Sequence, residues 1–193
     1  MMANTTSLTL LERLREPCND AAWERFVLLY SPMLFAFARR AGMNDGDAED
    51  VVQDVFLLLM GELPRFEYDS ARKNFRGWLK TVTVNKCRER QRRQNHVATA
   101  FGGDGRLSDI VDDATVEAYW NGEFRQHLIS QALRVMKTDF AAQTWQAAWF
   151  ALTTDRTAAD IGRELGLGEA SVWVAKSRVL RKLRQELAGM LDD

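Results

Sequence analysis

Two helices joined by a glycine turn are predicted for residues 157–187, which read TAADIGRELGLGEASVWVAKSRVLRKLRQEL. Thr157 and Asp160 have the spacing of an N-terminal capping box, and Gly166 permits a tight turn between the helices. Leu167 is expected to fill the space between them. Apolar residues recur at helical spacing and predict one buried stripe on each helix. These residues are Ala158, Ile161 and Leu165 on the first helix, and Val172, Ala175, Val179, Leu183 and Leu187 on the second.

The second helix of this pair has a basic outer face. The side chains left outside its buried stripe are Ser171, Lys176, Ser177, Arg178, Arg181 and Lys182. A short helix, a glycine turn and a longer basic helix are typical of a helix-turn-helix, whose second helix enters the major groove of DNA. An ordinary pair of packed helices is the alternative. The agreement of stripe spacing, glycine position and basic face favours DNA binding.

The rest of the chain also predicts helices, so the fold class is all-α. Only three prolines occur among 193 residues, and most long segments show helical rather than alternating periodicity. Ser31-Pro32 is a candidate kink or break in one helix, and Gly61 is a candidate C-terminal cap of the next. The expected helices before the helix-turn-helix cover residues 8–16, 20–41, 47–61, 75–94, 115–136 and 139–152.

Two small helical domains joined by a flexible linker are expected. After Asn95 the composition changes, and three glycines occur among scattered acids. Between residues 104 and 123, six acids and one arginine give a local charge of −5. The predicted divisions are a helical domain at residues 8–95, an acidic flexible linker at 96–125 and the helix-turn-helix domain at 126–193.

A second basic segment lies at residues 75–93, FRGWLKTVTVNKCRERQRR. Its first half is apolar on one arc of the helical wheel, and its second half carries cations on the same arc. The sequence therefore predicts a helix that leaves the core halfway and presents charge. Residues 72–93 hold nine basic residues and one acid, a local charge of +8, which suits nucleic-acid phosphates. A solvated helix end with an excess of one charge is the alternative. The residues of the arc are Phe75, Trp78, Leu79 and Val82, then Lys86, Arg90 and Arg93.

An acidic stripe is predicted within residues 47–60, DAEDVVQDVFLLLM. Its members recur at intervals of three and four residues, opposite a valine-rich core face, and include one exposed leucine. A stripe of this composition suits a basic protein surface better than DNA. The alternative is the plain exterior of a soluble helix. The stripe consists of Asp50, Gln53, Asp54 and Leu57.

Other features of the composition exclude several classes of site. The net charge of −1 carries no information on a nucleic-acid partner. Cys18 and Cys87 are too few for a disulfide framework, and His96 and His127 lack neighbours at metal-ligand spacing, so no metal or cofactor is expected. Neither a signal peptide nor an apolar run of about 20 residues is present, which indicates a cytoplasmic protein without membrane contact.

These motifs together resemble bacterial RNA polymerase sigma factors of the small, two-domain extracytoplasmic-function (ECF) group. The resemblance rests on DAEDVVQDVF, FRGWLKTVTVNKCRERQRR and the helix-turn-helix, in this order, over residues 20–95 and 126–190. It implies that the acidic stripe docks on core RNA polymerase and that residues 67–94 open the −10 promoter region and hold its single strand. The C-terminal domain would read the double-stranded −35 element. The −10 contacts that the resemblance implies are Tyr68, Asn74, Lys80, Arg88 and Arg92.

The recognition helix departs from the pattern of the family. Many members begin it with threonine, valine, lysine, serine and arginine, whereas this chain has Ser171-Val172-Trp173-Val174-Ala175. The −35 contacts must therefore come from other side chains. The candidates are Ser171, Trp173, Lys176, Ser177, Arg178 and Arg181. Trp145, Trp149 and Phe150 are interpreted as core residues, with a surface for a regulatory partner as the alternative.

Three other functions compete with this interpretation. A stand-alone helix-turn-helix regulator leaves the acidic stripe unused. A nucleic-acid enzyme needs clustered carboxylates, but Glu89 is the one acid in the basic helix, so no catalytic residue is assigned. A pure protein-interaction module leaves both basic helices unexplained. Many sigma factors are held inactive by an anti-sigma factor, which makes such a protein a candidate partner, although the sequence identifies none.

Overall fold

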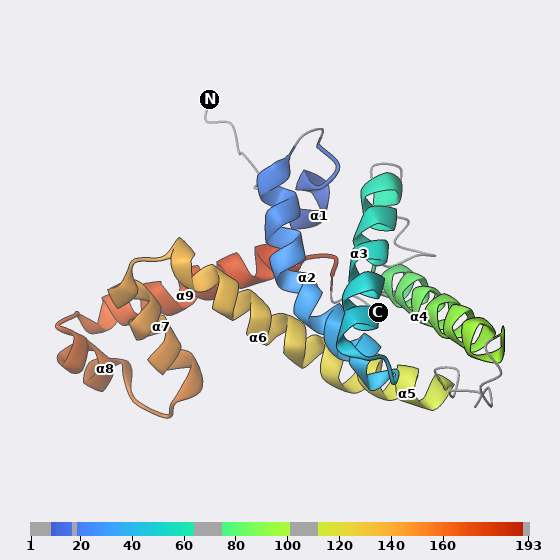
Figure 1. Cartoon of the computed structure of the whole chain (residues 1–193). Coiled ribbons are helices and arrows are strands. Elements are labelled where there is room, and N and C mark those ends of the chain that lie inside the picture. The colour runs from blue at the N-terminus through green and yellow to red at the C-terminus, as the bar shows by residue number, and fades with distance from the viewer. Residues whose placement is uncertain (1–8, 17–18, 64–74, 101–111, 191–193) are drawn as a thin grey trace. The chain divides into compact units, whose positions relative to one another are not determined.

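The computed structural model describes residues 9–16, 19–63, 75–100 and 112–190, and for residues 95–100 it describes the backbone alone. All regular elements in this part of the chain are helical, which confirms the all-α class (Figure 1). The elements are α1 (Leu10–Arg13), α2 (Asp20–Arg40), α3 (Asp45–Glu62), α4 (Phe75–Ala100), α5 (Asp113–Ala118), the π-helical turn η2 (Tyr119–Glu123), α6 (Phe124–Met136), the 3₁₀ turn η3 (Lys137–Asp139), α7 (Ala142–Thr153), α8 (Ala158–Leu165) and α9 (Glu169–Leu187).

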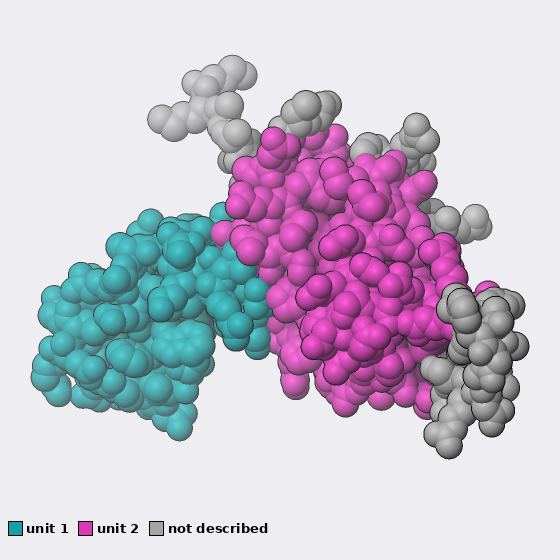
Figure 2. All heavy atoms as spheres, viewed as in Figure 1, with its two compact units in different colours: residues 1–9, 129–188 teal, residues 10–128, 189–193 magenta. Residues whose placement is uncertain are grey.

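The chain divides into two compact units, which Figure 2 colours separately. The N-terminal unit comprises residues 10–128 and 189–193, and the C-terminal unit comprises residues 1–9 and 129–188. The sequence predicts a linker over residues 96–125, whereas the structure has α4 continuing to Ala100 and helix resuming at Asp113. The physical reason is burial, because Tyr119 and Trp120 are each only 1% exposed within the N-terminal unit. The sequence prediction of a linker rested on the acids and glycines near these two aromatic residues.

An aromatic cluster forms the core of the N-terminal unit. The rings of Phe26 and Tyr30 in α2 lie 4.4 Å apart, and Tyr30 meets Phe75 of α4 at 5.9 Å. Further along α2, Phe37 lies 5.3 Å from Tyr119. Aromatic pairs at these separations stabilise a core beyond the effect of burial alone. The cluster therefore holds the η2 turn, far along the chain, on the same core as α2 and α4.

Helix α2 spans Asp20–Arg40, which agrees with the predicted helix to within one residue, and Pro32 lies inside it without ending it. The end of α3 differs from the prediction. Gly61 was expected to cap α3, but it lies within the helix, and Leu63 is the C-cap. The side chain of Leu63 is 1% exposed, and its burial extends the apolar face of α3 beyond the glycine.

The C-terminal unit is built from α7, α8 and α9 with the end of α6. Its core contains both predicted stripes, with Ile161 of α8 and Val172 and Val179 of α9 almost fully buried. Ala147 and Ala148 of α7 are also buried against them. Small residues on α7 let neighbouring helices approach closely. The predicted inward faces of α8 and α9 are confirmed.

Candidate functional site

The outer face of α3 carries the predicted acidic stripe. Asp50, Gln53 and Leu57 are exposed, and Leu57 retains 68% of its accessible surface. Asp54 is half-buried. The opposite face of the helix is in the core, where Val55 is fully buried. The structure thus brings the four predicted residues together on one face and leaves its leucine open to contact.

A carboxylate that sequence reasoning missed connects α3 to α4. Asp47 is 7% exposed and accepts hydrogen bonds from Nε of Arg90 at 2.8 Å and from Nδ2 of Asn44 at 2.6 Å. Gln94 also donates to it. Arg90 reaches Asp50 as well, with 2.5 Å between Nη2 and Oδ2. The hydrogen bond to Asp47 is the main reason that the pKa of Arg90 is raised. Asp47 is an acid in the first turn of α3, so the sequence alone made it look like an ordinary helix-start residue.

The buried face of α4 continues through the basic half of the helix. Thr83, Cys87 and Gln91 follow Phe75 and Leu79 at four-residue spacing, and all are at most 2% exposed. The prediction that this helix leaves the core halfway is therefore wrong.

Internal hydrogen bonds explain why polar side chains of α4 can be buried. Thr83 donates to the carbonyl oxygen of Leu79 at 2.7 Å, and Gln91 donates to that of Ala41 at 2.9 Å. A buried polar group that keeps a partner avoids most of its desolvation penalty. Burial also raises the pKa of the Cys87 thiol to about 12.

Two of the predicted −10 cations are paired with acids of α5. Lys80 forms an ion pair with Glu117, and Nη2 of Arg88 lies 2.8 Å from Oδ1 of Asp113. The hydrogen bond from Lys80 is the main cause of the lowered pKa of Glu117. These pairs were not predicted, because the acids were assigned to a linker. The basic face of α4 is therefore partly neutralised from within the N-terminal unit.

The other predicted −10 residues differ in their surroundings. Arg92 is exposed and pairs with no acid that the structure describes. Tyr68 and Asn74 lie outside the described residues. Trp78, which the sequence places on the apolar arc, is half-buried, and its ring lies 6.0 Å from that of Phe75.

The turn between α8 and α9 has the predicted geometry. Thr157 accepts a hydrogen bond from the backbone N–H of Asp160 at 3.1 Å, which caps α8. Gly166 adopts a φ of 66°, the left-handed conformation that glycine tolerates best. The N–H of Leu167 then donates to the carbonyl oxygen of Gly162 at 2.8 Å. This turn fixes where α9 begins relative to α8.

The outer face of α9 presents polar, cationic and apolar side chains together. Five of the six predicted −35 residues are exposed, namely Ser171, Trp173, Ser177, Arg178 and Arg181. Trp173 is 51% exposed, and Nζ of half-buried Lys176 lies 5.4 Å from its ring centroid, a cation–π contact.

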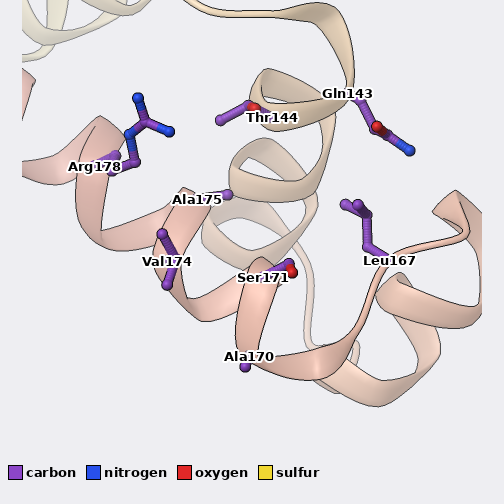
Figure 3. A pocket seen from close by; sticks show the side chains of 8 residues that line it. All are labelled: Gln143, Thr144, Leu167, Ala170, Ser171, Val174, Ala175 and Arg178. Carbon is purple, nitrogen blue, oxygen red and sulfur yellow. The ribbon is translucent and has the colours of Figure 1, made fainter.

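A hollow of about 330 Å³ lies beside this face in the C-terminal unit, and Figure 3 shows its lining. Gln143 and Thr144 come from α7, Leu167 from the turn, and Val174 and Arg178 from α9. Gln143 also donates to the carbonyl oxygen of Leu165 at 2.7 Å, which joins α7 to the end of α8. The first turns of α7 and α9 therefore border one surface.

An aromatic groove of about 930 Å³ was not predicted as a surface. Trp145 and Trp149 are stacked with ring centroids 6.1 Å apart, but Trp149 is 42% exposed. Arg134 and Lys137 also line this groove. The interpretation of the α7 aromatics as core residues holds for Trp145 and is wrong for Trp149. An exposed tryptophan beside cations is the signal of an interaction surface, but its exposure is visible only in the fold.

The N-terminal unit contains a match to a known sequence family. Residues 26–97, from α2 into α4, match the sequence family Sigma-70 region 2. This segment of the chain is therefore similar to sigma-70 region 2. The chain is 32% identical over 87 residues to the RNA polymerase sigma factor CarQ of Myxococcus xanthus, which covers 45% of this chain and 48% of that protein. It is 32% identical over 92 residues to the RNA polymerase sigma factor CnrH of Cupriavidus metallidurans, which covers 48% of this chain and 46% of that protein.

The chain thus spans about half the length of these curated relatives. No solved structure matches it significantly. The sigma-70 region 2 match includes both the exposed stripe of α3 and the basic half of α4. Helices α7–α9 lie beyond the residues of that match. In the part of the chain that the structure describes, no helix has the length and apolarity that a membrane span requires.

Proposed function

We propose that the chain is an ECF-type sigma factor that binds core RNA polymerase and directs promoter-specific initiation of transcription. It would recognise the −35 and −10 elements and stabilise the opened strand, so its work is done by binding and needs no catalytic residue. The observation that carries this proposal is the sigma-70 region 2 match over residues 26–97. The exposed acidic stripe and the basic helix lie within the same residues.

Core polymerase is the proposed partner of the α3 stripe. Leu57, 68% exposed among acids, offers an apolar anchor with a charged rim, which is the composition of many protein interfaces. Asp54 offers a charge that a basic partner would attract. Asp50 has a second role, because its pair with Arg90 also joins α3 to α4.

Promoter DNA is the proposed partner of α4 and α9. The exposed guanidinium of Arg92 would bind phosphates of the −10 strand. Lys80 and Arg88 would bind further phosphates once these displace Glu117 and Asp113. In the C-terminal unit, α8, its glycine turn and α9 have the order and capping of a helix-turn-helix. The exposed Arg178 of α9 would then face the −35 duplex.

A stand-alone DNA-binding regulator is the alternative. The same α8–α9 geometry supports it, but it gives the exposed leucine and acids of α3 no role. Binding to core polymerase therefore decides between the two functions.

The test measures the affinity of the chain for bacterial core RNA polymerase, with two double variants. Asp54→Arg/Leu57→Ala changes the stripe and leaves the pair between Asp50 and Arg90 intact. We expect it to weaken binding by more than about tenfold, which corresponds to about 1.4 kcal/mol. The matched control is Glu24→Arg/Leu28→Ala on α2, where Leu28 is 49% exposed. It makes the same chemical changes on another helix of the N-terminal unit and should leave the affinity unchanged.

Two results would redirect the proposal. Equal loss in both variants would show that the α3 stripe is not the docking face. Absence of binding by the unmodified chain, with salt-sensitive DNA binding retained, would favour the stand-alone regulator.

A further inference from the structure

Two large apolar side chains are exposed on the otherwise basic helix α9. Trp173 and Val174 are 51% and 55% exposed, and both lie in the first half of the helix. In a helix-turn-helix the N-terminal residues of the second helix approach the base edges. Apolar groups of this size reduce solubility when they contact only water. DNA bound to this part of α9 would cover both side chains.

Val174 lies on the side of α9 that faces away from the core. Val172, Ala175 and Val179 form the buried stripe, and at 100° per residue Val174 and Arg181 lie on the opposite side of the helix. Val174 is therefore directed away from the buried stripe of α9.

Val174 and Arg178 form a ridge between two hollows of the C-terminal unit. Both residues line the hollow against Gln143 and Thr144, which Figure 3 shows. Both also line a second hollow of about 360 Å³, together with Trp173, Ser177 and Arg181. A ridge with an apolar residue one turn before an arginine has the shape and charge to enter a groove of DNA.

In the major groove of DNA, the group that an apolar side chain such as Val174 can contact is the methyl group of thymine. Valine has no hydrogen-bond donor or acceptor in its side chain. Among the base pairs, thymine is the one that presents a methyl group in the major groove, and apolar side chains contact it. Trp173 lines the second hollow together with Val174, and Nζ of Lys176 lies 5.4 Å from its ring centroid. The ring then extends the apolar surface.

We propose that Val174, flanked by Trp173, contacts thymine methyl groups of the −35 duplex and so specifies thymine in that element. This inference rests on the proposed function, because it requires that α9 reads double-stranded promoter DNA.

The experiment first selects −35 duplexes from a randomised library, with the full chain both bound to core polymerase and alone. Each thymine of the selected site is then replaced by uracil, which lacks the 5-methyl group and keeps the same pairing. For the unmodified chain we expect at least one replacement to weaken binding about fourfold, the effect of exposing one buried methyl group. In Val174→Ser the same replacement should have no effect. Val27→Ser on α2, where the valine is 38% exposed, is the matched control and should keep the response to uracil.

Each outcome decides a separate point. A selected site without thymine, or full tolerance of uracil at every position, overturns the inference while the selected site itself supports DNA reading. A response to uracil that persists in Val174→Ser overturns it as well. Failure to select any duplex, with or without core polymerase, rejects the proposed function and the inference together.

Discussion

A methyl group added at Gly162 would strike the backbone of the turn between α8 and α9. A Cβ built at this position lies 2.6 Å from the carbonyl oxygen of Leu167 and 3.5 Å from its carbonyl carbon. Non-bonded heavy atoms are best separated by about 3.5–4.0 Å, so the contact with the oxygen is too short. Gly162→Ala therefore forces the turn to move.

The magnitude follows from how little the turn can relax. The N–H of Leu167 donates to the carbonyl oxygen of Gly162 at 2.8 Å, so the two backbone segments are already joined at this point. Overpacking of this kind destabilises by about 1–3 kcal/mol. The higher helix propensity of alanine offsets about 1 kcal/mol of that loss. Because the clashing atom is backbone, we expect a net loss of about 1–2 kcal/mol.

The assay combines thermal unfolding with hydrogen exchange resolved by segment. For a domain of this size, a loss of about 1–2 kcal/mol lowers the midpoint by about 4–16 °C. Exchange should accelerate in α8 and α9 and stay unchanged in α2–α4. The matched control is Gly61→Ala in α3, where an added Cβ meets nothing within 4 Å. It should stabilise the N-terminal unit by up to about 1 kcal/mol. Equal stability of the two variants would refute the close approach of α8 to the turn.

Three further predictions concern single contacts. Tyr119→Phe removes the hydroxyl that donates to the carbonyl oxygen of Met33 at 2.7 Å, and should destabilise the N-terminal unit by about 1–3 kcal/mol in urea unfolding. Thr157→Ala removes the cap of α8 and should destabilise the C-terminal unit by about 1 kcal/mol in the same assay. Asp113→Asn/Glu117→Gln removes the acids that pair with Arg88 and Lys80 and should raise the affinity for single-stranded −10 DNA severalfold, measured by fluorescence anisotropy.

Each of these variants has a control of matched chemistry. Tyr30→Phe makes the same change as Tyr119→Phe, but the buried Tyr30 hydroxyl has no hydrogen-bond partner among the described residues, so its loss should be neutral or stabilising. Thr153→Ala removes a hydroxyl that bonds within α7 and caps no helix N-terminus, so it should have little effect. Asp20→Asn/Glu49→Gln removes the same amount of negative charge from other surfaces. If this variant raises the DNA affinity as much as Asp113→Asn/Glu117→Gln does, the effect comes from net charge alone and not from the ion pairs of α4.

Sequence reasoning predicted the elements that repeat apolar residues regularly. The stripes of α8 and α9 and the capping role of Thr157 needed only local information, because helix periodicity and caps are properties of neighbouring residues. The same reasoning failed at Gln91, whose burial depends on the carbonyl oxygen of Ala41, distant in the sequence. It also failed at Trp120. The acids nearby in sequence indicated a solvent-exposed linker, whereas the ring packs against Phe37 of α2 and Phe124 of α6.

The candidate site shows the same division between local and distant information. The α3 stripe could be predicted, because its four residues share a face through helical spacing alone. The partners of Lys80 and Arg88 could not, because Glu117 and Asp113 follow them by 37 and 25 residues. Exposure of Trp149 depended on which side of α7 its neighbours cover, and the spacing of the aromatic residues did not reveal it.

The ion pairs between α4 and α5 would affect how the proposed binding to promoter DNA responds to salt. Each cation that neutralises a phosphate normally releases counterions from the DNA and adds about −0.9 to the slope of log affinity against log salt concentration. When a phosphate displaces Glu117 from Lys80, the freed carboxylate stays attached to the chain and retains a cation beside the complex. The same holds for Asp113 and Arg88. If the chain binds promoter DNA as proposed, we expect the salt slope to count the phosphates held by cations such as Arg92, which pairs with no described acid, and to be smaller than the number of basic residues on α4 would give.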